Sequence, residues 1–392
     1  MNILYLSVLV SPSALREAEN TDRAFSAYAV QKFHHLLTRG LVKNGAIVSV
    51  LSTFYLPRVG KGFFRKSEYC DGVHFDYIPT LNSSLFRHPW LVAYCFVRVL
   101  LFGIFNRHEK VLFCDVLNVS ACMGAVAAAK LIGLRRVGIV TDMPEFAVGV
   151  DAGSRQNLGK KIFSSRLNMK TINGFSHFVF LTEQMNPVLN KKGKPYIIME
   201  GLVDSSFVMS DKKGKKTKKI VLYAGGIDEK YGLGLLVEGF IHAQVKDSEL
   251  HIYGDGPFVP RIKEYDKEYA NVFYMGIQPN KVIVEKEQEA TLLVNPRPTK
   301  EDFTKYSFPS KNMEYMLSGI PLLTTKLPGM PQEYYPYVYL FEEESIEGYA
   351  GRMMDVLSLP AEELRAKGMR AREWVVDNKN NIVQAKKIMD LI

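Results

Sequence analysis

The 392-residue sequence lacks several signatures by which common protein classes are recognised. It contains no G-x-x-x-x-G-K-[ST] loop and no G-x-S-x-G elbow, which argues against a P-loop nucleotidase and an α/β-hydrolase. No charged segment followed by an apolar one opens the chain, so we expect a cytoplasmic protein without a signal peptide. Its few cysteines have neither C-x-x-C nor metal-type spacing, so we expect reduced, mostly buried thiols and no bound metal. These cysteines are Cys70, Cys95, Cys114 and Cys122.

The composition is that of a globular protein, with 47% hydrophobic and 23% charged residues, and the length suggests two domains. The charge is uneven: residues 1–205 hold 24 basic and 14 acidic residues, and the remainder holds 26 and 27. A basic first half suggests an anionic partner such as a membrane surface, a lipid phosphate or nucleic acid. Alternatively, the excess only keeps the protein soluble. We favour an anionic membrane surface and expect no nucleic acid partner.

The expected domain break is the lysine-rich stretch 210–219, which contains no apolar residue and reads as a solvated linker. A nuclear-localisation or nucleic-acid tract is the alternative. We therefore expect a first domain over residues 1–209 and a second over 220–377. A C-terminal helix at about 378–392 is expected to pack back on the first domain.

Strand and helix patterns alternate through both halves, which predicts an α/β fold of two doubly wound, Rossmann-like domains. In open α/β sheets ligands bind at the carboxyl ends of the strands, so we expect these ends to face a central cleft. The expected strands cover 3–7, 47–52, 111–114, 137–140, 177–181, 219–223, 250–253, 271–274, 290–295 and 321–325. The expected helices include 24–41, 121–131, 162–171, 233–243, 281–288 and 311–318.

The segment Trp90–Phe105 is apolar apart from Arg98, and it is shorter than the twenty or so residues that span a membrane. We interpret it as a buried helix of the first domain. The alternative is a helix that docks on a membrane, with Arg87, Arg98 and Arg107 near lipid phosphates.

The most specific segment is Tyr306–Gly319, a helix pattern in which Ser310 is the expected N-cap and Gly319 ends the helix. Glu314 then occupies N4, one position past the capping-box site, so capping does not explain it. A helix N-terminus with free N–H groups and Lys311 suits a pyrophosphate. A carboxylate one turn further along can accept both hydroxyls of a ribose. An ordinary surface glutamate is the alternative.

This segment resembles the donor-site signature of family 4 retaining glycosyltransferases of the GT-B fold. The resemblance is strongest to a Pro-Ser-Lys branch that builds capsular and other cell-surface polysaccharides. It covers essentially the whole second domain, while the first domain resembles the family only weakly. The segments that carry it are 223–228, 252–257, 271–276, 308–323 and 327–333.

The resemblance implies a role for several residues. Glu314 would bind the ribose of the nucleotide. The Ser310–Lys311 turn and the Gly225–Gly226 loop would hold the diphosphate through backbone N–H groups. The family usually has an arginine where this chain has Gly226, which leaves Lys230 as the nearby cation for the departing diphosphate.

Further residues follow from the same comparison. The turn of Gly254, Asp255 and Gly256 would lie near the base and phosphates, although a G-x-G alone can be only a tight turn. Ile277, with the glycine before it, would mark where the nucleobase is read. Tyr306 stands where the family has its first glutamate, which affects how the donor sugar is gripped.

In the first domain the sequence has Thr141-Asp142 where the family often has a histidine before an acidic residue. Asp142 is the candidate polar group at the reaction centre, and a turn-capping aspartate is the alternative. Glu200 stands where the family commonly has Asn-Gly and is a candidate to line the cleft with Thr141. No Asp-x-Asp occurs, so a metal-held diphosphate is not indicated and we expect no cofactor.

We therefore expect a metal-independent, retaining glycosyltransferase that uses a UDP- or GDP-sugar. Its acceptor would be a glycan or lipid-linked intermediate of cell-surface polysaccharide synthesis. The protein would be cytoplasmic, at the inner face of the cell membrane. The alternatives are a non-catalytic nucleotide-sugar-binding subunit and a nucleotide-sugar 2-epimerase of the same fold.

Overall fold

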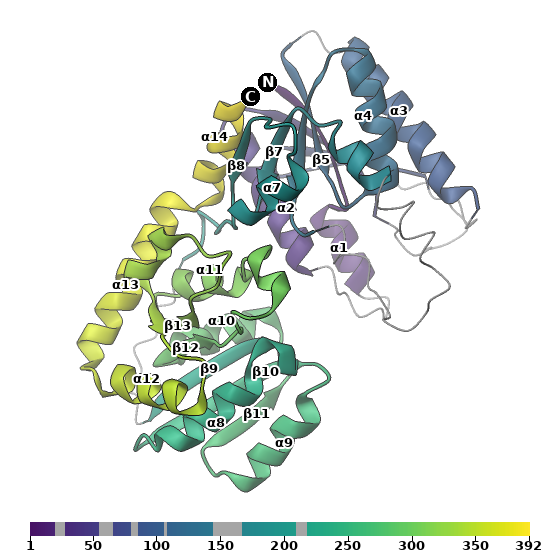
Figure 1. Cartoon of the computed structure of the whole chain (residues 1–392). Helices are drawn as coiled ribbons and strands as arrows, with labels where there is room; N and C mark the ends of the chain where they lie inside the picture. Colours follow the sequence, from purple (N-terminus) through teal and green to yellow (C-terminus); the bar gives the residue numbers. More distant parts are fainter. Residues whose placement is uncertain (20–27, 55–65, 80–84, 106–107, 144–166, 209–217) are drawn as a thin grey trace. The chain divides into compact units, whose positions relative to one another are not determined.

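The computed structural model describes residues 1–19, 28–54, 66–79, 85–105, 108–143, 167–208 and 218–392 (Figure 1). It divides the chain into two compact units. Unit 1 comprises Met1–Leu202 and Asn381–Ile392, and unit 2 comprises Val203–Asn380.

Unit 1 is built on one sheet in the order β3-β4-β2-β1-β5-β6-β7-β8, in which only the β3–β4 pairing is antiparallel. Its strands are β1 (Asn2–Ser7), β2 (Ile47–Ser52), β3 (Glu68–Cys70), β4 (Val73–Tyr77), β5 (Lys110–Asp115), β6 (Arg135–Val140), β7 (His177–Phe180) and β8 (Tyr196–Ile198). Its helices include α1 (Pro12–Glu19), α2 (Tyr28–Lys43), α3 (Arg87–Phe105), α4 (Val119–Leu131), the short η2 (Glu183–Met185) and α7 (Asn186–Leu189), and α14 (Asn381–Leu391).

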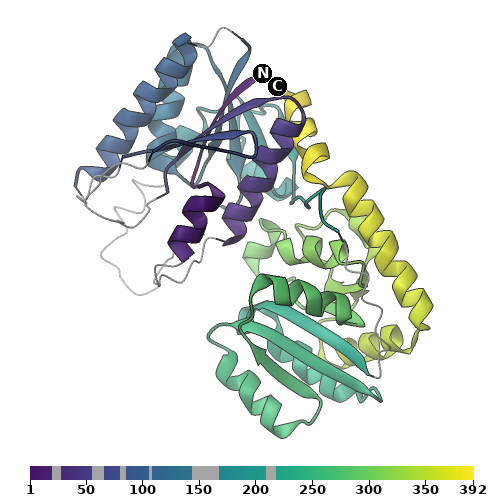
Figure 2. The ribbon, with the colours of Figure 1, turned by 180° about the vertical axis from the view of Figure 1, so that it is seen from behind.

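The C-terminal helix α14 packs beside α2 in unit 1 (Figure 2). The Asn381 side chain donates to the carbonyl of Leu36 at 3.2 Å, and Asn44 donates to the carbonyl of Ile382 at 2.8 Å. At Gly40, an added Cβ would lie 2.0 Å from the carbonyl oxygen of Asn381, so the two helices meet backbone to backbone. The last helix therefore returns to the unit in which the chain begins.

Unit 2 is a fully parallel sheet in the order β11-β10-β9-β12-β13-β14. Its strands are β9 (Lys219–Gly226), β10 (Ser248–Asp255), β11 (Val272–Gly276), β12 (Leu292–Asn295), β13 (Leu322–Thr325) and β14 (Tyr339–Phe341). Its helices are α8 (Leu233–Ala243), α9 (Val259–Glu268), α10 (Asn280–Glu289), α11 (Ser310–Leu317), α12 (Ile346–Ser358) and α13 (Ala361–Asn378), with the short turns η3 (Glu229–Tyr231), η4 (Asp302–Lys305) and η5 (Gln332–Tyr337).

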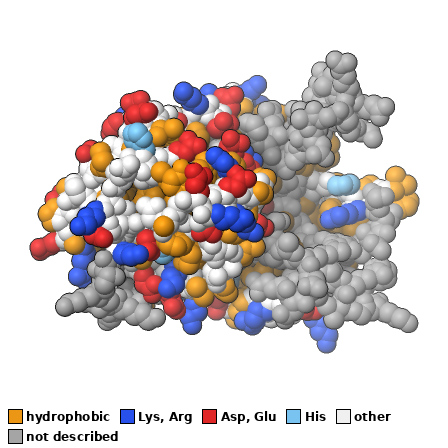
Figure 3. All heavy atoms as spheres, turned by 90° about the horizontal axis from the view of Figure 1, so that it is seen from below, with side chains coloured by type: hydrophobic (Ala, Val, Ile, Leu, Met, Phe, Trp, Pro, Cys, Tyr) orange, Lys and Arg blue, Asp and Glu red, His pale blue; other side chains and the backbone are white. Residues whose placement is uncertain are grey.

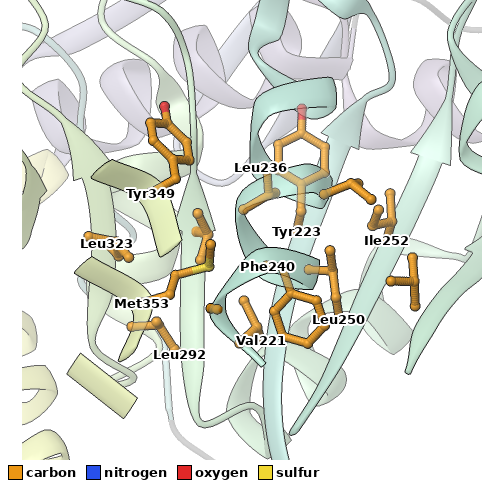
Figure 4. Close-up of a cluster of buried hydrophobic side chains, with 14 of the residues drawn as sticks. Val221, Tyr223, Leu236, Phe240, Leu250, Ile252, Leu292, Leu323, Tyr349 and Met353 are labelled. Atoms are coloured by element: carbon orange, nitrogen blue, oxygen red, sulfur yellow. The ribbon is translucent and has the colours of Figure 1, made fainter. Parts of the chain in front are cut away.

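Both faces of the unit 2 sheet are covered, and β9 shows how. Val221 and Tyr223 belong to the apolar cluster formed with α8 and α12, where Figure 4 shows Val221 near Phe240 and Tyr223 near Leu236. Leu222 and Ala224, which alternate with them along the strand, belong to a second cluster, formed with α10 and α11. Alternate residues of a strand point to opposite faces, so a continuous apolar strand is the one that suits a sheet between two helix layers.

The observed boundaries differ from the expected ones both where the chain passes from unit 1 to unit 2 and where it returns to unit 1. Val203, expected in the first domain, forms a bridge with Asn380, and its N–H donates to the carbonyl of Lys379 at 2.9 Å. The Phe207 carbonyl accepts from Arg372 of α13 at 3.4 Å. These contacts hold the segment before the lysine-rich stretch in unit 2. Most of that stretch, residues 209–217, lies outside the described residues.

The expectation of a buried helix at Trp90–Phe105 is wrong for most of its surface. α3 is fully buried only at Cys95 and Val99, while Ile104 and Phe105 are 65% and 76% exposed. It packs along one side on α4, where an added Cβ at Gly124 would lie 2.0 Å from the carbonyl of Val92. By length and composition α3 could also cross a membrane, which for a single helix is weak evidence.

The four cysteines are free thiols, and all but the partly exposed Cys70 are buried, as expected. Burial raises the pKa of the Cys95 thiol to about 12, which keeps that thiol protonated and unreactive. On the face shown in Figure 3, basic and acidic side chains of the described residues are interspersed.

Candidate functional site

The strand order of unit 2 identifies where a ligand would bind. Numbered along the chain, the order β11-β10-β9-β12-β13-β14 is 3-2-1-4-5-6, the order of dinucleotide-binding sheets. The chain leaves β9 toward β10 on one side and later returns to β12 on the other. Ligands of such sheets bind outside the carboxyl ends of the strands at this switch point. The residues that end β9 and β12 are therefore the candidates.

A buried tyrosine joins α11 to the end of β9. The hydroxyl of Tyr315 accepts from the N–H of Ala224 at 2.8 Å and donates to the carbonyl of Ala224 at 3.2 Å. Glu314 precedes this tyrosine and Gly225 follows this alanine. The tyrosine contact thus brings the predicted ribose-binding carboxylate and the predicted phosphate-binding glycines to one end of the sheet.

A second contact holds the first turn of α11 against β12. The Asn295 amide donates to the Asn312 side-chain oxygen at 2.6 Å, and both residues are buried. The carbonyl of Asn295 also accepts from the Thr324 hydroxyl at 3.0 Å, which ties β12 to β13. α11 is therefore positioned by both strands of the switch point.

The start of α11 differs by one position from the prediction. Ser310 is the first helical residue and Pro309 is at the N-cap, where it offers no capping side chain. The first N–H groups of a helix have no partner within it, so they are available to a ligand. Lys311 lies at this end, with its Nζ 3.2 Å from Oε2 of Glu314. Both side chains are partly exposed.

The glycines at the ends of β9 and β10 allow the two backbones to approach closely. Gly225 and Gly226 continue the strand and do not form a loop, in contrast to the prediction. Gly254 has φ +130°, and an added Cβ there would lie 1.8 Å from the carbonyl of Gly225. The N–H of Ile227 donates to the carbonyl of Asp255 at 2.8 Å. Both strand ends therefore form one edge that side chains would push apart.

Gly256 makes a similar approach, because its added Cβ would lie 2.2 Å from the carbonyl of Ile227. Ile277 follows β11 and is 70% exposed, and the glycine before it has φ +70°. Tyr306 ends the turn η4, where its N–H donates to the carbonyl of Phe303 at 3.0 Å. The roles of Ile277 and Tyr306 in reading the base and sugar stay predictions.

The predicted phosphate cation Lys230 pairs with a carboxylate. Its Nζ lies 3.1 Å from Oδ2 of Asp228, and the hydrogen bond with Asp228 raises the pKa of the lysine. Its side chain is 53% exposed. Its role as a catalytic cation stays a prediction.

Arg297 lies two residues beyond β12 and is not among the site residues predicted from the sequence. Its guanidinium carbon lies 4.8 Å from the centre of the Tyr231 ring, while Nζ of Lys230 lies 5.3 Å from the same ring. The available signal was its position just after a predicted strand. Without the strand order, that position could not be recognised as the switch point.

The remaining predicted residues belong to unit 1. Asp142 follows β6, its Oδ1 accepts from the N–H of Met143 at 2.8 Å, and burial raises its pKa. The buried hydroxyl oxygen of Thr141 has no hydrogen-bond partner among the described residues. Glu200 is only 3% exposed. Asp142 as a group at the reaction centre and Glu200 as a cleft residue stay predictions.

No group of three or more His, Cys, Asp or Glu side chains within the described ranges is arranged to hold a metal ion. The polar groups at the switch point include backbone N–H groups, two lysines, an arginine, and the carboxylates of Glu314 and Asp228. Such a set suits an anionic ligand with hydroxyl groups.

Residues 206–374 match the family model described as glycosyl transferases group 1. No curated protein matches the chain in sequence.

Solved structures match the chain over its whole length. A sucrose-phosphate synthase from Thermosynechococcus elongatus is 14% identical with a TM-score of 0.66, covering 100% of this chain and 98% of its own. The lipopolysaccharide outer core galactosyltransferase WaaB in its apo form is 14% identical, with a TM-score of 0.63 and coverages of 100% and 99%. Anabaena HepE in complex with UDP is 12% identical, with a TM-score of 0.61 and coverages of 100% and 99%. The chain therefore has the two-domain GT-B glycosyltransferase fold, and its second unit carries the match to the glycosyl transferases of group 1.

Proposed function

We propose that this protein is a glycosyltransferase whose nucleotide-sugar donor binds at the switch point of unit 2. The observation that carries the proposal is the Tyr315–Ala224 contact, which brings Glu314 to the end of the glycine-terminated strand β9. The contact lies inside the segment that matches the group 1 family. The similar fold of HepE, which was solved with UDP, supports a nucleoside diphosphate as part of the donor.

In this proposal the donor is a UDP- or GDP-sugar. Glu314 accepts the ribose hydroxyls. The free N–H groups at the start of α11, with Lys311, hold the diphosphate against the glycine edge. The backbone beside Ile277 reads the base, and Tyr306 lies toward the sugar.

The proposed reaction retains the anomeric configuration and needs no metal. The bond between the anomeric carbon and the diphosphate oxygen breaks, and the acceptor oxygen bonds to that carbon on the same face. The acceptor proton passes to the departing diphosphate. Cations and helix N–H groups stabilise the leaving charge, which is electrostatic catalysis by a preorganised site. NMR of the product would show the inverted anomer if retention is wrong. Loss of activity in EDTA would contradict metal independence.

The first experiment incubates the full chain with a panel of UDP- and GDP-sugars and a mixture of glycan and lipid-linked acceptors. Transfer or slow hydrolysis supports the proposal. Donor epimerisation would indicate a nucleotide-sugar 2-epimerase. Binding without any turnover would indicate a non-catalytic nucleotide-sugar-binding subunit.

The donor site itself is tested by calorimetry with Glu314→Gln. Loss of charge-assisted hydrogen bonds to the ribose should lower the affinity for the nucleotide by about tenfold or more. The matched control is Glu373→Gln, an exposed glutamate on α13. Equal nucleotide affinity for wild type and Glu314→Gln would refute the ribose assignment.

We propose further that the acceptor belongs to cell-surface polysaccharide synthesis and is presented at an anionic membrane surface that unit 1 contacts. Support comes from the basic first half and from the exposed apolar end of α3 at Ile104 and Phe105. Apolar residues near basic ones are typical of proteins that dock on anionic lipid surfaces.

Sedimentation with phosphatidylglycerol vesicles tests this contact. The wild type should sediment, while the double variant Ile104→Ser/Phe105→Ser should remain largely in the supernatant. Val208→Ser is the control, because Val208 is a still more exposed apolar residue and belongs to unit 2. A wild-type protein that never sediments with anionic vesicles would refute the membrane contact.

A further inference from the structure

Arg297 lies at the switch point of unit 2, on a backbone that is fixed from several sides. The hydroxyl of Thr325 donates to the carbonyl of Arg297. The hydroxyl of Tyr349 donates to the carbonyl of Pro296 at 3.1 Å. An added Cβ at Gly232 would lie 2.2 Å from this same Pro296 oxygen, so the chain beyond β12 packs directly on the turn that follows β9.

The side chain of Arg297 is held between aromatic rings beside the end of β9. Its guanidinium carbon lies 4.8 Å from the centre of the Tyr231 ring and 5.5 Å from that of Phe303. A Cβ added to Gly226 would lie 3.2 Å from the edge of the same Tyr231 ring. The tyrosine therefore links the guanidinium to the glycine edge of the candidate site, and stacking on it limits the rotamers of the arginine.

The charge of Arg297 has no carboxylate partner within the described part of the chain. Its Nε is buried and makes no hydrogen bond there. Burial lowers the pKa of this arginine, as expected for a cation withdrawn from water without compensation. Lys230, on the same ring, is paired with Asp228. A part-buried cation without a counter-ion is costly unless a ligand supplies the anion.

We propose that Arg297 binds the diphosphate of the nucleotide-sugar donor and is the principal cation of the site. The proposal rests on the proposed donor site and names the residue that holds its negative charge. The planar guanidinium can donate two parallel hydrogen bonds to phosphate oxygens, which an ammonium cannot do. Its place just beyond β12, beside the end of β9, is where these sheets receive their ligand.

The test compares Arg297→Met with Arg297→Lys, using the full chain and titration calorimetry. Methionine keeps an apolar stem that can pack on Tyr231 and removes the charge, while lysine keeps the charge and loses the fork. The titrants are a nucleoside diphosphate that the wild type binds, its monophosphate and its free nucleoside. Arg365→Met, at an exposed arginine of α13, is the matched control.

Arg297→Met should lower the affinity for the diphosphate by about tenfold or more and change the affinity for the nucleoside less than twofold. The reason is that only the phosphates contact the guanidinium. The affinity of Arg297→Lys for the diphosphate should lie between those of the wild type and Arg297→Met. Without ligand, Arg297→Met should melt no lower than wild type, since an uncompensated charge is removed. Equal losses for nucleoside and diphosphate together with a lower melting temperature would instead indicate a structural arginine and overturn the proposal.

The outcomes separate this inference from the proposed function. If Glu314→Gln lowers the affinity for the nucleoside diphosphate and Arg297→Met leaves that affinity unchanged, only the role of Arg297 is refuted. If the wild type binds none of the nucleoside diphosphates tested, the donor site itself is refuted and Arg297 with it.

Discussion

The contact between Tyr315 and Ala224 should be a large contributor to the stability of unit 2. The ladder between β9 and β12 covers only Val221 and Leu222, so at Ala224 the tyrosine hydroxyl replaces the missing neighbour strand. Tyr315→Phe removes this hydroxyl and leaves a buried N–H without a partner. A lost hydrogen bond together with an orphaned donor costs about 2–3 kcal/mol.

The comparison variant is Tyr349→Phe, whose hydroxyl only donates to the carbonyl of Pro296. A carbonyl tolerates the loss of one donor better than an N–H tolerates the loss of its acceptor, so we expect a cost of about 1 kcal/mol. For a unit of this size each kcal/mol lowers the melting temperature by about 2–4 °C, which predicts a fall of roughly 5–10 °C for Tyr315→Phe. Calorimetric melting of both variants measures this. If Tyr315→Phe melts no lower than Tyr349→Phe, the stabilising role of the contact is refuted.

Other variants test the glycine edge and unit 1. Gly254→Ala should cost about 3 kcal/mol or more, because φ is +130° and its Cβ would collide with the carbonyl of Gly225. Gly276 has φ +70° with open space around it, so Gly276→Ala should lower the free energy of unfolding by only about 1–2 kcal/mol. Equal losses for the two variants in urea denaturation would contradict the close approach of Gly254 to Gly225. Asp142→Asn should raise the melting temperature at pH 7, because burial raises the pKa of this aspartate and so destabilises its ionised form. The gain should disappear below the ordinary pKa of 3.8, where both folded and unfolded states are protonated, and a gain that persists there would contradict this reasoning.

The regular elements could be predicted from the sequence because each has one dominant local signal. The predicted strand at 47–52 and helix at 233–243 agree with β2 and α8, since apolar runs and helical periodicity are properties of neighbouring residues. Short edge strands escaped prediction. β3 and β14 have three residues each, too few for a period to be recognised.

The misassignments have a common cause, which is that they depend on residues far apart in the sequence. The apolar composition of α3 predicted burial, but α4 covers only one side of it. Val203 belongs to unit 2 because it forms a β-bridge with Asn380, and no local sequence signal predicts that pairing.

The candidate site shows the same limit. Glu314 could be proposed from its segment, whereas the contact that positions it spans 91 residues. Its nearness to Gly226 in the sequence predicts Lys230 as the phosphate cation, whereas only the structure shows its ion pair with Asp228. Arg297 reaches the Tyr231 ring from the segment after β12, so only the strand order makes it a candidate.

Binding of a sugar donor's nucleotide at the switch point of unit 2 can be observed directly. The most direct measurement is a crystal structure of the chain with the nucleoside diphosphate that binds it most tightly. We predict the ribose hydroxyls within hydrogen-bond distance of the Glu314 carboxylate, with the diphosphate against the Gly225–Gly226 edge and the start of α11. A nucleotide bound elsewhere on the chain, with Glu314 touching no part of it, would refute the proposed donor site.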